Sequence, residues 1–501
     1  MKQAKVIFDK DYTVGEVDKR ITSSFVEHLG RCLYNGLYQP EHPSADKNGF
    51  REDVKELIRE LGVTAVRYPG GNFVSGYDWK DGVGPKEKRP HKKELAWSVI
   101  ETNEVGMNEF ADFLQDIGAE MIMAANLGTG TPKEAGELVD YCNTESGTCW
   151  SDLRRKHGVE KPHRFHTWCL GNEMDGEWQI CSMKPMEYAR KAKEAAKIMK
   201  WTDPSIECIA CGSCTSETFM GTYGEWDRIV LEEAYSCFEY LSLHRYFNYR
   251  TSKEDDVSDV PYFFKDLENY LSMAISAADF VKQRLRSDKT IYISFDEWGV
   301  VTPTSASIDR VNESFGYASF HELDAVIYGG ILCTFLNHAD RVKIACQSLL
   351  VNEGGMISTQ PEGKAIRQST YYPFQHVAKY GRGTALQGVF SMPKEGTRHH
   401  GEQETVKTAA VYNEAKKELT VFAMNCSLTE DAELQLDLRS FPSLSALEKI
   451  VLYHENPYAV NTFEKENEVI PHIETLEEPK CGKLSTLLKK HSWNVLRFTC
   501  G

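Results

Sequence analysis

Short apolar runs alternate with longer segments of helical spacing between about residue 20 and residue 355. The apolar runs contain many β-branched residues and are bounded by polar positions, a pattern that predicts strands. The eight predicted strands are residues 24–29, 63–68, 120–126, 165–170, 205–211, 240–244, 290–295 and 330–336.

The segments between these strands carry an apolar stripe with the period of an α-helix. Val54, Leu57, Ile58 and Leu61 stand at i, i+3, i+4 and i+7, and the segment 189–199 repeats this stripe. Eight such β-α repeats are typical of an α/β fold of the (β/α)8 TIM barrel type. A doubly wound open sheet shows the same alternation, so the pattern alone does not close the barrel. Further helices are predicted at residues 109–117, 132–142, 226–237, 270–285 and 315–328.

The pattern changes after about residue 380, where helical spacing stops and short strands are separated by turn-like segments. This change predicts a C-terminal β-sandwich of the jelly-roll type. Residues 4–9 also have the pattern of a strand, which we assign to the same sandwich although it precedes the barrel. The predicted organisation is an N-terminal strand region at 1–18, a catalytic barrel at 19–375 and the sandwich at 376–501.

Composition and charge narrow the possible functions. The chain has 501 residues, 41% of them hydrophobic, which excludes disorder as its main state. The 74 acidic residues outnumber the 58 basic ones, and the formal net charge of −16 disfavours a nucleic-acid partner through repulsion. The longest strongly apolar stretch, residues 325–336, is too short for a membrane-spanning helix.

The N-terminus and the cysteines predict the cellular location. Charged residues between positions 2 and 11 interrupt the apolar segment that a secretion signal needs, so we expect a cytoplasmic protein without a membrane partner. Fourteen cysteines are scattered along the chain, and Cys169, Cys333 and Cys346 lie inside apolar runs. We expect free thiols rather than disulfides.

Two glutamates follow predicted strands at the expected open end of the barrel, where TIM-barrel enzymes place their catalytic residues. The fourth strand ends in CLGNEMDGEWQ, with Asn172 and Glu173, and the seventh ends in ISFDEWGV, with Asp296 and Glu297. Two carboxyl groups facing one cavity can hydrolyse a glycoside, because one protonates the leaving oxygen while the other attacks the anomeric carbon or activates water. Either glutamate alone could cap a helix, but the two together favour a catalytic pair.

Other polar and aromatic residues follow strands on the same rim. A neutral polyol substrate requires such a mixture, because each unmatched buried polar group costs about 1–3 kcal/mol. Arg67 would be costly near a cavity unless it paired with a carboxylate such as Glu297. Trp97, Trp178 and Trp298 offer apolar faces for sugar stacking, although Trp298 also fits a place in the core. The other polar rim residues are Glu27, Asn72, Asn126, His244 and Tyr246.

Several longer motifs carry a resemblance to a known family, and they spread over nearly the whole chain. They are SFVEHLGRCLYNGLY, VRYPGGNFVSGYDWKDGVGP, LAWSVIETNEVGMNEF, NLGTGTPKEAGELVDYCN, CLGNEMDGEWQ, LSLHRYF, DEWGV and NHADRVKIA. On these motifs the chain resembles the α-L-arabinofuranosidases of glycoside hydrolase family 51, in clan A.

This resemblance implies an activity and a set of residue roles. It implies a retaining, exo-acting hydrolase of terminal α-L-arabinofuranosyl residues in oligosaccharides from arabinoxylan or arabinan, without a cofactor or a metal. Glu173 is then the acid/base and Glu297 the nucleophile, which Arg67 and His244 position. The resemblance also implies a homohexamer. The substrate-binding residues that it implies are Glu27, Asn72, Trp97, Asn172, Trp178 and Tyr246.

The chain departs from the family pattern in the segment that follows DRVKIA. Many members of the family carry Gln two residues before a Val-Asn pair there, and that side chain touches the sugar. Leu349 stands at this place, and the nearest glutamine, Gln347, is two residues earlier. This departure predicts the loss of a hydrogen bond to the furanose and leaves the exact sugar preference open.

Three alternatives stay open. A related clan A retaining glycosidase could have xylosidase or glucanase side activity. Cys208-x-x-Cys211-x-x-Cys214 and His163-x-x-His166 have spacings found in metal sites, but side chains alternate along a strand, so Cys208 and Cys211 should diverge. The C-terminal sandwich could also belong to a noncatalytic carbohydrate-binding protein, against which the pair of rim carboxylates argues.

Overall fold

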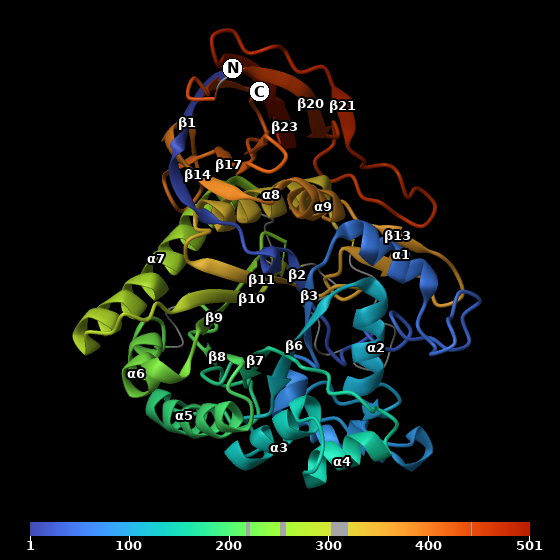
Figure 1. Ribbon diagram of the computed structural model, residues 1–501. Helices are drawn as coiled ribbons and strands as arrows, with labels where there is room; N and C mark the ends of the chain where they lie inside the picture. Colours follow the sequence, from blue (N-terminus) through green and yellow to red (C-terminus); the bar gives the residue numbers. More distant parts are fainter. Residues whose placement is uncertain (217–220, 251–256, 302–318, 442) are drawn as a thin grey trace.

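The computed structural model describes residues 1–501 except 217–220, 251–256, 302–318 and 442. Within these residues, eight parallel strands close a barrel in the order β10-β11-β2-β3-β6-β7-β8-β9, which confirms the predicted TIM barrel (Figure 1). The barrel strands are β2 (Ser23–Phe25), β3 (Ala65–Tyr68), β6 (Glu120–Ala125), β7 (Thr167–Leu170), β8 (Glu207–Cys211), β9 (Tyr240–Phe247), β10 (Tyr292–Val300) and β11 (Val342–Ser348).

Helices surround the barrel on its outer side (Figure 1). Helix α3 shows how local sequence sets a helix start: the Thr131 side chain accepts a hydrogen bond from the backbone of Glu134, and Pro132 occupies the first turn. The helices of the described chain are α1 (Glu52–Leu61), α2 (Met107–Ile117), α3 (Pro132–Asn143), α4 (Cys149–Lys156), α5 (Pro185–Thr202), α6 (Glu225–Ala234), α7 (Val260–Leu285), α8 (Glu322–Asn337) and α9 (Tyr371–Tyr380).

The prediction of the eighth strand was wrong. Residues 330–336 lie in the second half of α8, and the last barrel strand is β11, further along the chain. Every side chain of α8 from Glu322 to Leu336 is buried, so the helix has no polar face that could reveal its period. The helix predicted at 315–328 lies partly outside the described residues, and its described end forms the start of α8.

The strands after residue 380 form a second unit. In the described part of the chain they build one nine-stranded sheet, in the order β21-β20-β23-β18-β17-β14-β1-β19-β22. β1 (Lys2–Glu16) pairs with β14 and β19, which confirms that the N-terminal strand joins this sheet. The sheet strands other than β1 are β14 (Thr384–Ser391), β17 (Val406–Asn413), β18 (Glu418–Asn425), β19 (Ala432–Asp437), β20 (Leu444–Leu452), β21 (His472–Glu474), β22 (Lys483–Leu488) and β23 (Ser492–Cys500).

This sheet curls around its own core instead of forming two separate layers. Val6, Leu434 and Leu484 from one end of the sheet pack in the same apolar cluster as Val421 and Phe498 from the other end. Short two-stranded ladders complete the described structure: β4 (Lys92–Lys93) with β5 (Ile100–Glu101), β12 (Ile357–Thr359) with β13 (Ala365–Arg367), and β15 (Lys394–Gly396) with β16 (Glu402–Glu404).

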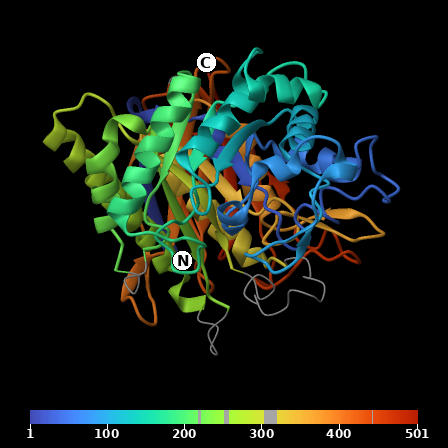
Figure 2. The ribbon, with the colours of Figure 1, turned by 90° about the horizontal axis from the view of Figure 1, so that it is seen from below.

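The barrel and the curled sheet meet across α8 and α9 (Figure 1). Seen from below, the barrel helices lie in front and the orange and red strands of the sheet lie behind them (Figure 2). None of the helices in the described ranges combines the length and apolar character needed to cross a membrane. The fourteen cysteines are free, as expected, and Cys169, Cys333 and Cys346 are buried.

Candidate active site

A cavity of about 330 Å³ opens among the loops that follow the barrel strands. Both predicted catalytic glutamates reach it, although they stand on strands far apart in the sequence. The residues that line it are Phe25, Glu27, Leu29, Gly71, Asn72, Trp97, Glu173, Tyr246, Glu297, Val300, Val301, Ser348, Leu349, Glu353 and Gly354.

A β-bulge in β10 turns two consecutive carboxylates into the barrel. Ser294 stands opposite Ser242, but the next paired residue, Glu297, stands opposite His244, so β10 contains one extra residue there. Side chains normally alternate between the faces of a strand, and the bulge suspends this alternation. Asp296 and Glu297 are therefore both buried on the inner side.

Arg67, on β3, neutralises this pair of carboxylates. Its guanidinium donates a hydrogen bond of 2.7 Å to Glu297 Oε1 and one of 2.6 Å to Asn172 Oδ1, and its Nε lies 3.5 Å from Asp296 Oδ2. The pairing that the sequence predicted for this costly buried charge is thus present. Burial alone would raise the pKa of Asp296, but Arg67 and His244 outweigh it and lower that pKa.

Glu173 follows β7 in a strained backbone conformation. Its φ of 45° lies in the left-handed region, which costs a residue with a side chain on the order of 1–2 kcal/mol. The conformation aims the carboxyl group at two donors: Trp178 Nε1 lies 2.6 Å from Oε2, and His244 Nδ1 lies 2.9 Å from Oε1. The surrounding side chains therefore fix the direction of this carboxyl group.

His244 lies between three carboxyl groups. Its Nε2 is 3.1 Å from Asp296 Oδ1, and its Nδ1, besides contacting Glu173, is 3.6 Å from Glu297 Oε2. Burial alone would lower the pKa of His244, but the negative charges of Glu297 and Asp296 and the contact with Glu173 raise it to about 10. The imidazole is therefore protonated at neutral pH and donates from both nitrogens.

Tyr246 and Glu27 complete the polar wall. The Tyr246 hydroxyl donates to Glu297 Oε2 at 2.7 Å. Glu27 Oε1 accepts hydrogen bonds from the backbone of Phe73 at 2.9 Å and from Trp97 Nε1 at 3.1 Å. Burial, together with the negative charge of Glu297, raises the pKa of Glu27 to about 8.

The ten residues proposed from the sequence come together at one place. Glu27, Asn72, Trp97, Glu173, Tyr246 and Glu297 line the cavity. The other four, Arg67, Asn172, Trp178 and His244, contact them or one another through the hydrogen bonds given above and lie behind or beside the cavity wall. Trp298, by contrast, is fully buried in the core, and the side chain of Asn126 bonds within its own loop and to the carbonyl oxygen of Tyr77.

Comparison with known proteins identifies the family. Two family models match: the α-L-arabinofuranosidase 1 domain over residues 57–258 and the α-L-arabinofuranosidase C-terminal domain over residues 296–492. The chain is 45% identical to an intracellular exo-α-(1→5)-L-arabinofuranosidase of Halalkalibacterium halodurans, over 99% of both chains. The chain belongs to the α-L-arabinofuranosidase family.

Further relatives and solved structures agree with this assignment. An intracellular exo-α-(1→5)-L-arabinofuranosidase 1 of Bacillus subtilis is 44% identical over 99% of both chains. A family 51 α-L-arabinofuranosidase from Bifidobacterium longum has a TM-score of 0.93 at 35% identity, covering 99% of this chain and 100% of that one. A Thermotoga maritima α-L-arabinofuranosidase in complex with arabinose has a TM-score of 0.86 at 30% identity, over 99% of both chains.

Sequence reasoning gave no role to several residues of this arabinofuranosidase-family site. Asp296 was noted beside Glu297, but only the bulge shows that both side chains turn inward. Ser348, whose hydroxyl oxygen lies 2.7 Å from that of Tyr246, and Glu353 were missed, because they come from the segment after the misplaced last strand. The position of Ser348 at the C-terminal end of a barrel strand would have been the signal, had β11 been recognised.

Leu349 forms an apolar part of the cavity wall, at the position where the resemblance described above implies Gln. Gln347 does not replace that amide, because it is fully buried and its Nε2 donates to the hydroxyl of Tyr328 and to the carbonyl of Gly354, both at 3.0 Å. The departure noted in the sequence thus removes a polar group from this wall of the site.

The structure does not favour the metal hypothesis. Among the described residues, no cluster of three metal-type ligands includes Cys208, Cys211 or Cys214. The cluster that has suitable geometry is Glu173, His244 and Glu297, with one atom of each within 4.8 Å of the others. A protonated His244 has no lone pair to offer a metal, so this cluster is better explained as a charge-balanced pair of carboxyl groups.

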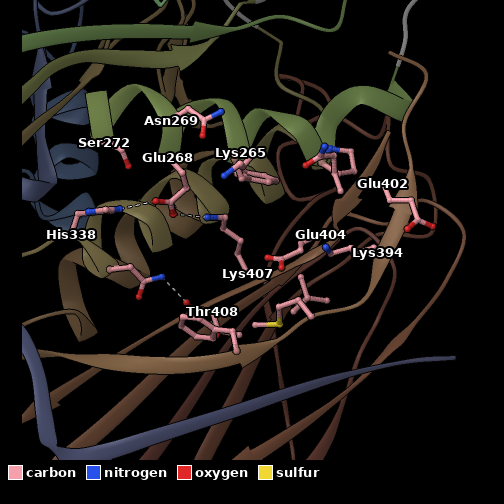
Figure 3. A pocket seen from close by; sticks show the side chains of 17 residues that line it. Lys265, Glu268, Asn269, Ser272, His338, Lys394, Glu402, Glu404, Lys407 and Thr408 are labelled. Atoms are coloured by element: carbon pink, nitrogen blue, oxygen red, sulfur yellow. Dashed lines mark hydrogen bonds and ion pairs between the residues drawn. The ribbon is translucent and has the colours of Figure 1, made fainter. Parts of the chain in front are cut away.

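A larger cavity, of about 720 Å³, lies away from these carboxylates, between α7 and the β15–β16 ladder (Figure 3). Here Glu268 lies 2.7 Å from His338 Nε2 and 2.7 Å from Lys407 Nζ, an ionic link between barrel and sheet. Burial alone would raise the pKa of Glu268, but these two partners outweigh it and lower the pKa to about 2. Neither Glu173 nor Glu297 lines this cavity, so we assign catalysis to the smaller one.

Proposed function

We propose that this protein is a retaining, exo-acting α-L-arabinofuranosidase. It removes terminal non-reducing α-L-arabinofuranosyl residues from oligosaccharides derived from arabinoxylan or arabinan. The observation that carries the proposal is the closeness of the Glu173 and Glu297 carboxyl groups, which have oxygens within 4.8 Å of each other. Retaining glycosidases place their carboxyl groups about 5–5.5 Å apart, whereas inverting enzymes need about 6.5–9.5 Å to admit a water molecule.

The first step forms a covalent glycosyl-enzyme. The Glu297 carboxylate attacks the anomeric carbon, the bond to the leaving oxygen breaks, and the protonated Glu173 delivers its proton to that oxygen. Hydrogen bonds from Arg67 and Tyr246 hold the two oxygens of Glu297 in place for this attack.

The second step releases the sugar. Glu173, now ionised, takes a proton from a water molecule, which attacks the anomeric carbon and displaces Glu297 as a carboxylate. Two inversions at the same carbon give net retention. In this proposal Arg67 and His244 position the nucleophile, and the residues that bind the sugar are Glu27, Asn72, Trp97, Asn172, Trp178 and Tyr246.

The names of the relatives support an α-(1→5) linkage, although one Bifidobacterium longum relative, 37% identical over 99% of this chain, is an exo-α-(1→6)-L-arabinofuranosidase by name. Several of these names also include "intracellular". We therefore propose that the enzyme acts inside the cell on short oligosaccharides. We further propose that it works as a homohexamer, which light scattering coupled to size-exclusion chromatography measures directly.

Proton NMR during hydrolysis of an aryl α-L-arabinofuranoside tests the central proposal. The first sugar released should be α-L-arabinofuranose, before mutarotation, and α-(1→5)-arabino-oligosaccharides should lose terminal residues one at a time. A β anomer as first product would contradict the retaining mechanism. The same assay on aryl xylosides and glucosides tests whether this protein also has the side activities of a related clan A glycosidase. An absence of turnover on every glycoside would favour a noncatalytic carbohydrate-binding protein.

A further inference from the structure

A fourth glutamate, Glu353, lines the substrate cavity besides Glu27, Glu173 and Glu297. Glu353 lines the same cavity as Glu173 and Glu297 but comes from the loop after β11. Its residue is 6% exposed, so the carboxyl group is almost fully removed from bulk water. Burial raises the pKa of Glu353 to about 7.

The protein uses only part of the hydrogen-bonding capacity of the Glu353 carboxyl group. Glu353 Oε1 accepts a hydrogen bond of 3.2 Å from the backbone N–H of Arg31. The positive charge of Arg31 acts on Glu353 and by itself would lower its pKa, but the Arg31 side chain forms its hydrogen bonds elsewhere: its Nη2 donates to the carbonyl and hydroxyl oxygens of Thr359. No other hydrogen bond or ion pair to the Glu353 carboxyl group comes from the residues that the structure describes. A carboxylate can accept about four hydrogen bonds, so most of its capacity is left for a molecule in the cavity.

Apart from its polar residues, the cavity that Glu353 lines has several apolar side chains. They include Leu29, Val300, Val301 and Leu349. A buried carboxyl group without enough partners is costly, and cavities that bind small molecules use a few such groups to fix the orientation of a ligand. The backbone supports the placement, because a side chain at Gly30 would come within 2.6 Å of Glu353 Oε1.

We propose that Glu353 is a specificity-determining residue that hydrogen-bonds a hydroxyl group of the sugar bound in the cavity. The inference rests on the proposed arabinofuranosidase function and adds a contact to that same site. The hydroxyl belongs either to the terminal arabinofuranosyl residue or to the next sugar. Both have the same chemistry, and the choice of substrate separates them.

The test compares Glu353→Ala and Glu353→Gln with the wild type on an aryl α-L-arabinofuranoside and on an α-(1→5)-arabino-oligosaccharide. Glu353→Ala should lower kcat/KM about 10- to 100-fold on at least the oligosaccharide, because a hydrogen bond to a carboxylate is lost. Glu353→Gln keeps an acceptor oxygen for Arg31 and should lose less. A loss on both substrates places the hydroxyl on the terminal residue, and a loss on the oligosaccharide alone places it on the next sugar.

Deoxy substrates separate this contact from a structural role of Glu353. They are aryl arabinofuranosides that each lack one hydroxyl group, or oligosaccharides that lack one in the second sugar. On the analogue without the partner hydroxyl, Glu353→Ala and the wild type should have equal kcat/KM. Glu362→Gln, an exposed glutamate on the turn between β12 and β13, is the matched control. Equal effects of Glu353→Ala on all analogues, or wild-type kcat/KM for both variants on all substrates, would overturn the proposal. A wild-type enzyme without turnover would instead overturn the proposed function.

Discussion

Glu173 and Glu297 have the same side chain but are held by different groups. Glu297 accepts hydrogen bonds from the guanidinium of Arg67 and from the phenol of Tyr246. Glu173 meets Trp178 and His244 and reaches the cavity from a strained turn rather than from a strand. The difference in surroundings supports separate roles for two chemically identical groups.

Substituting each glutamate should separate these roles through the leaving group. Glu173→Ala removes the proposed proton donor. This loss matters little for a nitrophenolate that leaves as an anion, so the first step should survive on activated aryl substrates. The second step loses its base, so pre-steady-state kinetics should show a burst, and azide should raise turnover by attacking without base help. On natural oligosaccharides kcat/KM should fall at least about 100-fold.

Glu297→Ala should behave differently in each respect. It should lose turnover on good and poor leaving groups alike, show no burst, and form with azide a product of the opposite anomeric configuration. Glu194→Ala, a change on the exposed face of α5, is the control for the handling of the protein. An exchange of the two behaviours would reverse the roles, and wild-type turnover of both variants on oligosaccharides would place the chemistry elsewhere.

The raised pKa of His244 predicts how stability depends on pH. The pKa of His244 is about 6.5 in the unfolded chain and about 10 in the folded protein. Between pH 6.5 and pH 10, therefore, His244 is protonated in the native state and mostly deprotonated in the unfolded state. The stabilisation is therefore complete below about pH 6.5 and disappears as the pH rises towards 10, at about 1 kcal/mol per pH unit.

Thermal unfolding of the wild type and of His244→Gln between pH 6 and pH 10.5 measures this effect. The wild type should lose Tm relative to the variant as the pH rises through this window. His91→Gln, at an exposed site, is the matched control and should follow the wild-type curve. Parallel curves for the wild type and His244→Gln would show that His244 does not hold its proton through this range.

At the scale of elements, the sequence predicted most of the barrel. Seven predicted strands overlap barrel strands, because each is a short apolar run between polar loops. The second half of α8, residues 330–336, was predicted as a strand. This helix is buried on all sides, so its sequence shows no polar face from which the helical period could be recognised. The bulge at Asp296 and the left-handed turn at Glu173 could not be predicted, because neighbouring strands and side chains impose them.

Two glycines let α8 approach its neighbours closely. A Cβ at Gly329 would lie 2.3 Å from Trp493 of β23, and one at Gly330 would lie 2.2 Å from Phe264 of α7. Glycine normally destabilises a helix interior by about 1 kcal/mol relative to alanine. Its presence at both positions of this helix is therefore explained by packing rather than by helix propensity.

Gly329→Ala should lower the free energy of unfolding by about 1–3 kcal/mol, although helix propensity alone would predict a gain. The reason is that Trp493 is fully buried and cannot move aside without opening the surrounding core. Gly396→Ala is the matched control, since its Cβ would meet nothing within 4 Å. A stability of Gly329→Ala equal to or above the wild type, measured by denaturant unfolding, would contradict the close approach.

At the scale of the whole molecule, the barrel and the curled sheet share a core. Phe422, Trp493 and Val495, on the barrel-facing side of the sheet, belong to the same apolar cluster as the barrel interior. β1 precedes the barrel in the chain but lies in that sheet, where it pairs with β14 and β19, two strands that follow the barrel. The two units are thus expected to unfold together rather than one after the other.

Trp493→Ala tests this coupling at its centre. Trp493 stacks on Phe422 with ring centroids 5.7 Å apart, and its indole donates a hydrogen bond of 3.1 Å to His376 Nδ1. Truncating a buried tryptophan costs about 3–5 kcal/mol, so Tm should fall by several degrees while far-ultraviolet circular dichroism and activity are lost in one transition. Trp201→Ala removes a tryptophan that is 77% exposed on α5 and should leave Tm within about a degree of the wild type. If Trp493→Ala instead melted the sheet first and left an active barrel, the shared core would not couple the two units.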